Sequence, residues 1–167
     1  MEHLMTRTRQ LIGLVGWLLA CYAVAGIGAR ASIAAASFYG SLALPSWAPP
    51  AQVFGPVWTL LYGMMAVAAW LVWREGGWAR QRRPLLLFLA QLVVNALWSW
   101  LFFAWRQGGM AFVDIALLWV LILATLVIFW RVRVAAGALL LPYLCWVGFA
   151  LALNYVAWRG NPHLLGY

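Results

Sequence analysis

The stretch FGPVWTLLYGMMAVAAWLVW, residues 54–73, carries no charged side chain from end to end. An α-helix needs about 20 consecutive apolar residues to cross the hydrocarbon core of a bilayer, and this stretch has that length. Four further segments meet the same criterion, so the predicted spans are residues 11–29, 54–73, 85–105, 111–130 and 134–158. The sequence therefore predicts an all-α integral membrane bundle of five transmembrane helices, with residues 1–167 forming one domain.

The composition agrees with a membrane protein. Of the 167 residues, 67% are hydrophobic and 8% are charged, and the mean hydropathy is +0.91. An ordinary soluble domain has about 25% charged residues. The formal net charge is +8, but every basic residue is an arginine, and the arginines lie singly or in small groups between apolar runs. This pattern predicts a lipid bilayer as partner and argues against nucleic-acid binding. No CxxC or cysteine–histidine pairing indicates a metal site.

The arginines divide unequally between the two sides of the predicted spans. One side carries Arg7, Arg9, Arg74, Arg80, Arg82, Arg83, Arg131 and Arg133, and the other carries Arg30, Arg106 and Arg159. The positive-inside rule then places the N-terminus in the cytoplasm, in what we expect to be a bacterial cell membrane. With five spans, the long loop 30–53 and the C-terminus lie on the opposite face.

Polar and aromatic residues recur at helical spacing in three spans. In 85–105, Gln91, Asn95, Trp98 and Ser99 share one face. Interhelical hydrogen bonding explains such a face, and so does the wall of a cavity. Two other spans carry similar faces, comprising Trp58, Tyr62 and Ala66 in one and Trp146, Ala150, Leu153 and Asn154 in the other. With a rise of about 1.5 Å per residue, all three faces fall in one half of the membrane, which favours a shared cavity opening toward the long loop.

The long loop is rich in proline, which restricts the chain before it enters the second span. Prolines fix φ and reduce the freedom of the chain. Loop 30–53 and the first turn of the next helix contain Pro45, Pro49, Pro50 and Pro56. These residues could hold the loop as a stiff cover over the cavity, or they could form a rigid connector with an interfacial tryptophan. The sequence leaves both interpretations open.

Asp114 is the only carboxylate in any predicted span. It lies about one turn from the start of its helix, where the helix dipole favours an anion, and Arg106 is near in sequence. Structural anchoring is the favoured interpretation, and proton chemistry is the alternative.

Several motifs resemble those of the TspO/MBR family. In chain order they are PSWAPP (45–50), FGPVWTLLY (54–62), QLVVNALWSWLFF (91–103) and PYLCWVGFALALNYVAWR (142–159). The family contains the bacterial tryptophan-rich sensory proteins and the mitochondrial translocator protein, also called the peripheral benzodiazepine receptor. The resemblance covers nearly the whole chain after about residue 35.

The resemblance implies a homodimer of five-helix bundles with a pocket under the first loop. Its ligands would be porphyrins such as protoporphyrin IX, related tetrapyrroles and benzodiazepine-site drugs, with no cofactor required. By motif, the family's pocket residues correspond to Tyr39, Trp58, Asn95, Trp146 and Ala150. With the neighbouring positions on the same faces, the predicted ligand-binding set is Tyr39, Pro49, Trp58, Tyr62, Asn95, Trp98, Ser99, Trp146, Ala150 and Leu153.

The first loop departs from the family pattern. Phe38-Tyr39-Gly40 stands where the family often has Trp-Tyr-Asp, and Leu44-Pro45 stands where it often has Lys-Pro. The loop therefore lacks the aspartate and lysine charges of the family pattern, which puts in doubt how it would close over the cavity. At the other end of the chain, Leu153, Tyr155 and Arg159 fit a cholesterol-recognition pattern, but the end of many membrane helices would match it.

Three functions that involve a ligand are compatible with these observations, and a structural role as an assembly partner in a membrane complex is a fourth alternative. The first is a membrane sensor or regulator that binds tetrapyrroles on indole faces. The second, implied by the resemblance, is a light-dependent porphyrin-degrading enzyme in which Trp58 and Trp146 are catalytic. The third is transport of porphyrin or sterol, for which the chain offers no internal repeat and few charges.

Overall fold

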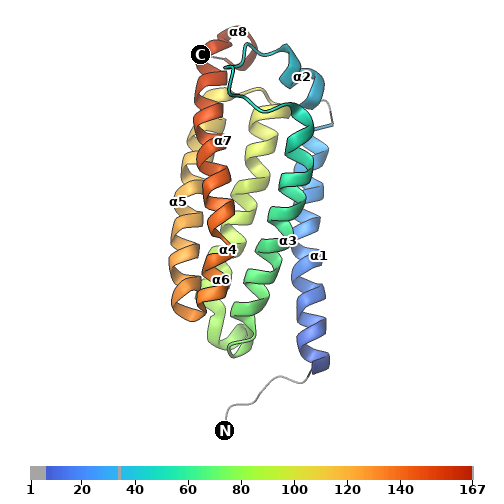
Figure 1. Ribbon diagram of the computed structural model, residues 1–167, viewed down its shortest axis with the longest axis vertical. Coiled ribbons are helices and arrows are strands. Elements are labelled where there is room, and N and C mark those ends of the chain that lie inside the picture. Colours follow the sequence, from blue (N-terminus) through green and yellow to red (C-terminus); the bar gives the residue numbers. More distant parts are fainter. Residues whose placement is uncertain (1–6, 34, 167) are drawn as a thin grey trace.

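The computed structural model describes residues 7–33 and 35–166, and within them the chain is helical without a β-strand (Figure 1). Its long helices are α1 (Arg7–Ala31), α3 (Phe54–Trp73), α4 (Gly77–Ser99), α5 (Gly108–Val132) and α7 (Leu141–Gly160). With the short helices that extend some of them, five helices are long and apolar enough to cross a membrane. The prediction of an all-α membrane bundle of five spans is confirmed.

The helices pack as one bundle in which α5, at one edge, packs against both α4 and α7, while α1 packs against α3 and α4 (Figure 1). Short connections join α4, α5 and α7, so successive helices run antiparallel, as expected for neighbours in a bundle. The buried core includes Met65, Phe88, Ile115 and Tyr143, each no more than 2% exposed. Side chains from at least three helices therefore share one core.

The third span starts earlier than predicted, at Gly77 instead of residue 85. Arginines and Pro84 precede residue 85, and a proline inside a helix removes one hydrogen bond and clashes with the preceding turn. The helix accommodates Pro84 through a break at Gln81, whose φ is −105° and ψ 21°, and the Gln81 side chain donates to Glu75 O at 2.9 Å. The break at Gln81 separates residues 77–80 from the helical segment that follows, so Pro84 lies in the first turn of that segment, where a missing N–H removes no hydrogen bond.

The fifth span is broken where the sequence predicted one continuous helix over 134–158. It consists of α6 (Val134–Ala138) and α7, with Pro142 in the first turn of α7. The residue before a proline disfavours the helical conformation, and proline is best tolerated at a helix start. The chain therefore begins a new helix at this point.

The long loop contains more regular structure than predicted. Helix α1 continues to Ala31, α2 covers Ala35–Ser41, and a short 3-10 helix, η1, covers Ala51–Val53 before α3. A π-helix, η2 (Trp100–Ala104), extends α4 at the same end of the bundle, and α8 (Pro162–Leu165) follows α7 there (Figure 1). The first loop lies across this end of the bundle, which we call the loop end.

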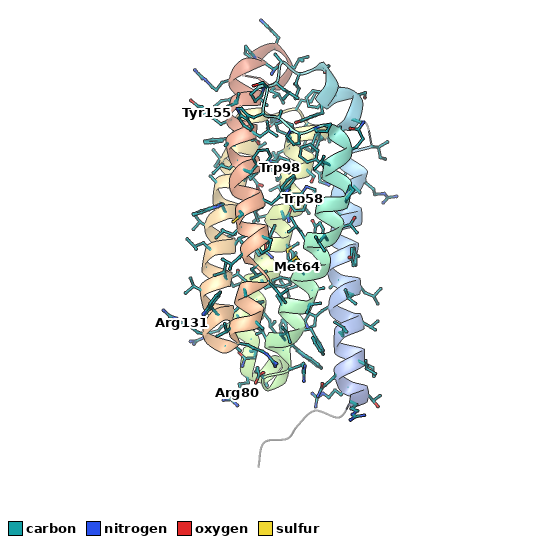
Figure 2. All side chains as sticks on the ribbon, in the orientation of Figure 1. Trp58, Met64, Arg80, Trp98, Arg131 and Tyr155 are labelled. Atoms are coloured by element: carbon teal, nitrogen blue, oxygen red, sulfur yellow. The ribbon has the colours of Figure 1, made fainter. Side chains whose placement is uncertain are left out.

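The two ends of the bundle differ in charge. Arg80 and Arg131 lie at the end opposite the first loop, as Figure 2 shows, and the start of α1 is at that end too. One ion pair joins two turns there, with Arg133 Nη1 donating to Glu75 Oε1 at 3.0 Å. The arginine asymmetry read from the sequence is thus an asymmetry of the folded bundle.

Candidate functional site

The main cavity lies in the loop half of the bundle, between α1, α2, α3 and α4, and has a volume of about 400 Å³. Alanines and a glycine, together with Tyr22 and Tyr39, make the α1 and α2 walls, while aromatic rings line α3 and α4. The residues around it are Tyr22, Ala25, Gly28, Ala29, Ser32, Ala35, Ala36, Tyr39, Ala51, Phe54, Gly55, Trp58, Thr59, Tyr62, Asn95, Trp98, Ser99 and Phe103. A cavity of this size is in the range of small-molecule sites.

Six of the residues predicted from the sequence line this one cavity: Tyr39, Trp58, Tyr62, Asn95, Trp98 and Ser99. Trp58 projects from α3 and Trp98 from α4 in the same half of the bundle (Figure 2). The rings of Trp58 and Tyr62 lie 5.8 Å apart, and Trp98 stacks on Phe102 at 5.5 Å. The faces predicted for the second and third spans therefore meet.

The predicted contribution of the last span is not found at this cavity. Trp146, Ala150 and Leu153 do not belong to its lining. Phe54 does line it, and its ring contacts the Trp146 ring at 5.8 Å, so Trp146 packs against a residue of the lining without belonging to it. The Trp146 Nε1 atom is buried without a hydrogen-bond partner.

Hydrogen bonds of Asn154 hold one face of α7 against α4 and α5 in the core of the bundle. Trp98 Nε1 donates to Asn154 Oδ1 at 3.0 Å, and Asn154 Nδ2 donates to Gly108 O at 3.1 Å. These bonds fix the rotation of α7 against α4 and α5. The Trp98 N–H is thereby used, so Trp98 offers the cavity its ring and not its donor.

The α1 wall was missed by the sequence interpretation. Ala25, Gly28 and Ala29 lie at i, i+3 and i+4 on α1, which places them on one helix face, and Ser32 follows just after the helix ends. Small residues at this spacing could have been read from the sequence as a cavity wall. A helix face with small side chains leaves space where it packs against a helix with aromatic side chains. Ala29, Gly55 and Thr59 are also exposed, so the cavity opens between α1 and α3 at the outer surface of the bundle.

Pro49 lies outside the main cavity but holds one of its walls. Its carbonyl accepts a hydrogen bond of 3.0 Å from the Tyr39 hydroxyl. Burial raises the pKa of the Tyr39 hydroxyl, so the group stays protonated and donates at neutral pH. Pro49 also lines a second space of about 330 Å³ under the loop, which shares Tyr39 with the main cavity.

The loop is fastened to the bundle at two further points. Asn161, between α7 and α8, accepts from Ala43 N at 2.8 Å and donates to Ala43 O at 3.1 Å. The guanidinium of Arg106 lies over the Phe38 ring at 4.9 Å, a cation–π contact. These contacts hold the loop across the loop end, which is compatible both with a cover over the cavity and with a rigid connector.

Removing the Asn161 side chain should loosen this cover. In Asn161→Ala, we expect amide hydrogen exchange at Ala43 to accelerate by about tenfold, because the backbone loses its two side-chain bonds. Gln52→Ala, an exposed change in the same loop, serves as the control. Hydrogen exchange with mass spectrometry measures the effect, and equal exchange in the two variants would show that Asn161 does not fasten the loop.

Asp114 is buried on α5 at 7% exposure, and its Oδ2 atom has no hydrogen-bond partner. The expected partnership with Arg106 is not present, since no ion pair joins the two within the described part of the chain and Arg106 lies over Phe38 instead. Arg106 has a φ of 55°, which turns the chain between η2 and α5. Asp114 does not line the cavity.

The residues of the sterol pattern do not share one surface. Leu153 is buried at 6% exposure, whereas Tyr155, two positions later on the same helix, is 48% exposed. Figure 2 shows Tyr155 at the outer side of α7. Successive helical residues are about 100° apart, so residues i and i+2 point to different sides. The motif therefore does not form a single patch with Arg159.

Among the described residues, no group of three or more histidine, cysteine, aspartate or glutamate side chains lies close enough together to hold a metal ion. The lining residues with polar side-chain groups include Asn95 with its amide, Ser99, Tyr62, Tyr22, Ser32, Tyr39 and Thr59 with their hydroxyls, and Trp58 with its indole. Such groups can orient a ligand by hydrogen bonds and stacking.

The match to a family extends over most of the bundle. Residues 17–159 match the TspO/MBR family. This range contains all or part of each of the four helices that form the cavity. This chain belongs to the TspO/MBR family. It is 43% identical to the translocator protein of Homo sapiens over 126 residues, covering 74% of this chain and 75% of that protein.

Bacterial relatives cover more of the sequence. The tryptophan-rich protein TspO of Chlorobaculum tepidum is 40% identical over 157 residues, which cover 92% of this chain and 99% of that protein. Protein CrtK of Rhodobacter capsulatus is 37% identical over 150 residues, covering 87% and 91% of the two chains. Membership of the TspO/MBR family and the five spans together make this an integral membrane protein.

Proposed function

We propose that this TspO/MBR protein is a membrane sensor or regulator that binds a tetrapyrrole, such as protoporphyrin IX, in the cavity between α1 and α4. The observation that carries the proposal is the cavity wall formed by Trp58, Tyr62 and Trp98. Indole and phenol rings supply large apolar faces on which a flat ligand can stack. A relative from Cereibacter sphaeroides, 34% identical, is named tryptophan-rich sensory protein.

The shape of the cavity supports a large, flat and membrane-soluble ligand. Its volume of about 400 Å³ is modest for a macrocycle. Exposed Ala29, Gly55 and Thr59 leave one side open toward the surrounding lipid, so part of a larger ligand can remain in contact with acyl chains. A sterol or a benzodiazepine-site drug fits the same description, and competition between ligands separates these possibilities.

We further propose that the chain lies in a bacterial cell membrane with its N-terminus in the cytoplasm. The end that holds Arg80 and Arg131 would then face the cytoplasm, in keeping with the positive-inside rule. The cavity would lie in the half of the membrane farther from the cytoplasm. The protein would act as a homodimer.

The function is tested by titrating the purified protein with protoporphyrin IX in detergent, in the dark, with the porphyrin absorbance spectrum as the signal. We expect saturable binding of one porphyrin per chain, with Trp58→Phe weakening it by about threefold to tenfold because a smaller ring loses stacking area. Trp146→Phe is the matched control, since Trp146 does not line the cavity.

The same samples distinguish the enzymatic alternative when they are illuminated. Protein-dependent loss of porphyrin in the wild type that disappears in Trp58→Phe would favour degradation, with the Trp58 indole as electron donor. Saturable dark binding without such loss supports a sensor. Absence of saturable binding in the wild type would overturn the tetrapyrrole proposal.

A further inference from the structure

One side of α4 carries two arginines at its beginning and apolar side chains along its length. All of these residues are exposed, and they are Arg82, Arg83, Leu86, Ala90, Val93 and Leu97. A helix turns by about 100° per residue, so the four apolar side chains point in directions that lie between those of the two arginines. Together they form a single surface, which we call the α4 outer face.

Arg82 and Arg83 are not used by the protein itself, although other arginines at the same end of the bundle are. Arg133 pairs with Glu75 at 3.0 Å, and the guanidinium of Arg74 lies over the Trp70 ring at 4.6 Å. Within residues 7–33 and 35–166, no ion pair, hydrogen bond or ring contact involves the side chain of Arg82 or Arg83. Both charges are therefore available to an anion outside the protein.

The α4 outer face has the dimensions of one lipid leaflet. At about 1.5 Å per residue, Val93 lies about 16 Å along the helix from Arg82. Half of a hydrocarbon core is about 15 Å thick. Arg80, at the end of the bundle opposite the first loop in Figure 2, and Trp78, which is 42% exposed, precede this face. Exposed tryptophan is typical of the membrane interface, so the arginines lie at headgroup level and the apolar residues at acyl-chain level.

We infer that the α4 outer face binds an anionic phospholipid, with the phosphodiester held by Arg82 and Arg83 and an acyl chain lying along the apolar residues. Two guanidinium groups can donate several charge-assisted hydrogen bonds to phosphate oxygens. A zwitterionic lipid offers the same phosphate, but its cationic group is repelled by the arginines. A soluble acidic partner would leave the apolar part of the face uncovered. None of these residues lines the cavity, so the lipid site is separate from the proposed tetrapyrrole site.

Native mass spectrometry of the detergent-purified protein tests this site, with phosphatidylglycerol and phosphatidylcholine of identical acyl chains added at equal concentrations. One arginine near an anionic headgroup raises affinity by about fivefold, so we expect the wild type to prefer phosphatidylglycerol by about twentyfold. Arg82→Gln and Arg83→Gln should each lower this preference by about fivefold. Glycerophosphoglycerol, which has the same headgroup without acyl chains, should not displace the lipid, whereas displacement would show a site for free phosphodiesters and overturn the inference.

Arg7→Gln is the matched control. It removes one exposed arginine from the same end of the bundle, but on α1 instead of α4. The preference for phosphatidylglycerol should therefore stay at the level of the wild type. If Arg7→Gln lowers the preference as much as Arg82→Gln and Arg83→Gln do, the lipid responds to the net charge of this end of the bundle. That result, or equal retention of the two lipids by the wild type, would overturn the inference.

A second copy of the chain is the other possible occupant of the α4 outer face. Val93→Cys in a Cys145→Ala background places a thiol at the centre of this face, while the remaining Cys21 is buried. Oxidation with copper phenanthroline in liposomes should leave this variant as a single chain on a denaturing gel. A covalent dimer would assign the face to a second copy and overturn the inference. Single chains, together with a preference that depends on Arg82 and Arg83 but not on Arg7, support the lipid site.

Discussion

Gly137→Val should lower the free energy of unfolding by roughly 3 kcal/mol or more, at the upper end of the cost of overpacking a core. Gly137 lies in α6, where the chain folds back against the end of α5. A Cβ atom at this position would lie 2.7 Å from Trp130 Cβ and 2.8 Å from Trp130 Cα. A side chain can rotate away from such a contact, but the Cα atom belongs to the backbone of α5. The turn between the last two spans would have to open.

Gly26→Val is the matched control for this prediction. Gly26 is also a helical glycine, and nothing lies within 4 Å of the Cβ atom that it would carry. Circular dichroism during unfolding of detergent-purified protein in sodium dodecyl sulfate compares the two variants with the wild type. A Gly137→Val protein as stable as Gly26→Val would show that α6 does not pack as closely on α5 as the structure has it.

The spans could be predicted from the sequence because the bilayer leaves little choice. A run such as residues 54–73, without a charge over the thickness of the hydrocarbon core, must be a helix with its backbone groups bonded internally. The helix boundaries were harder to predict. Pro84 follows the break at Gln81 within α4, and Pro142 lies in the first turn of α7, so each proline is close to the start of a helical segment. The prolines mark these starts, but the short helical turns that precede them, residues 77–80 and α6, carry no equally clear signal.

The α3 and α4 walls of the cavity could be predicted because their aromatic and polar residues recur at helical spacing. Spacing identifies a face but not the direction in which that face points. The face with Trp146 and Ala150 therefore looks equivalent to the face with Trp58 in the sequence, although Trp146 contacts Phe54 of the lining and does not itself line the cavity. The α1 wall was not predicted, because Ala25 and Gly28 are small residues without the aromatic or polar groups from which the other walls were recognised.

The hydrogen-bond partner of Asn95 could not be predicted from the sequence either. Gln91 and Asn95 are one turn apart, and two buried amides require partners across the bundle. The sequence indicated that such partners exist but not which residue supplies them. Tyr143, next to Pro142 and fully buried, bonds to both amides. That pairing depends on the rotation of α7, which only the folded structure defines.

Ala25→Phe should weaken protoporphyrin IX binding by about thirtyfold to a hundredfold. Ala25 lies on the α1 wall, opposite the aromatic residues of α3 and α4 that line the same cavity. A phenyl group there would occupy the space that the ligand needs. Expelling it would cost the free energy gained by burying a large apolar side chain, which is about 2 to 3 kcal/mol.

Ala23→Phe provides a control that differs only in position. It makes the same substitution two residues earlier on α1, at an exposed position outside the cavity lining. The phenyl group then faces away from the cavity, and the added bulk meets no wall of the site. Both variants should fold to the same helix content, which circular dichroism verifies before any ligand is added.

The most direct measurement of the central claim is therefore the equilibrium dissociation constant of protoporphyrin IX for the wild type, Ala25→Phe and Ala23→Phe in parallel. The cavity between α1 and α4 is the ligand site if Ala25→Phe loses affinity while Ala23→Phe binds like the wild type. Equal binding by all three proteins would contradict this account, because the ligand would then occupy a place that the filled cavity does not touch.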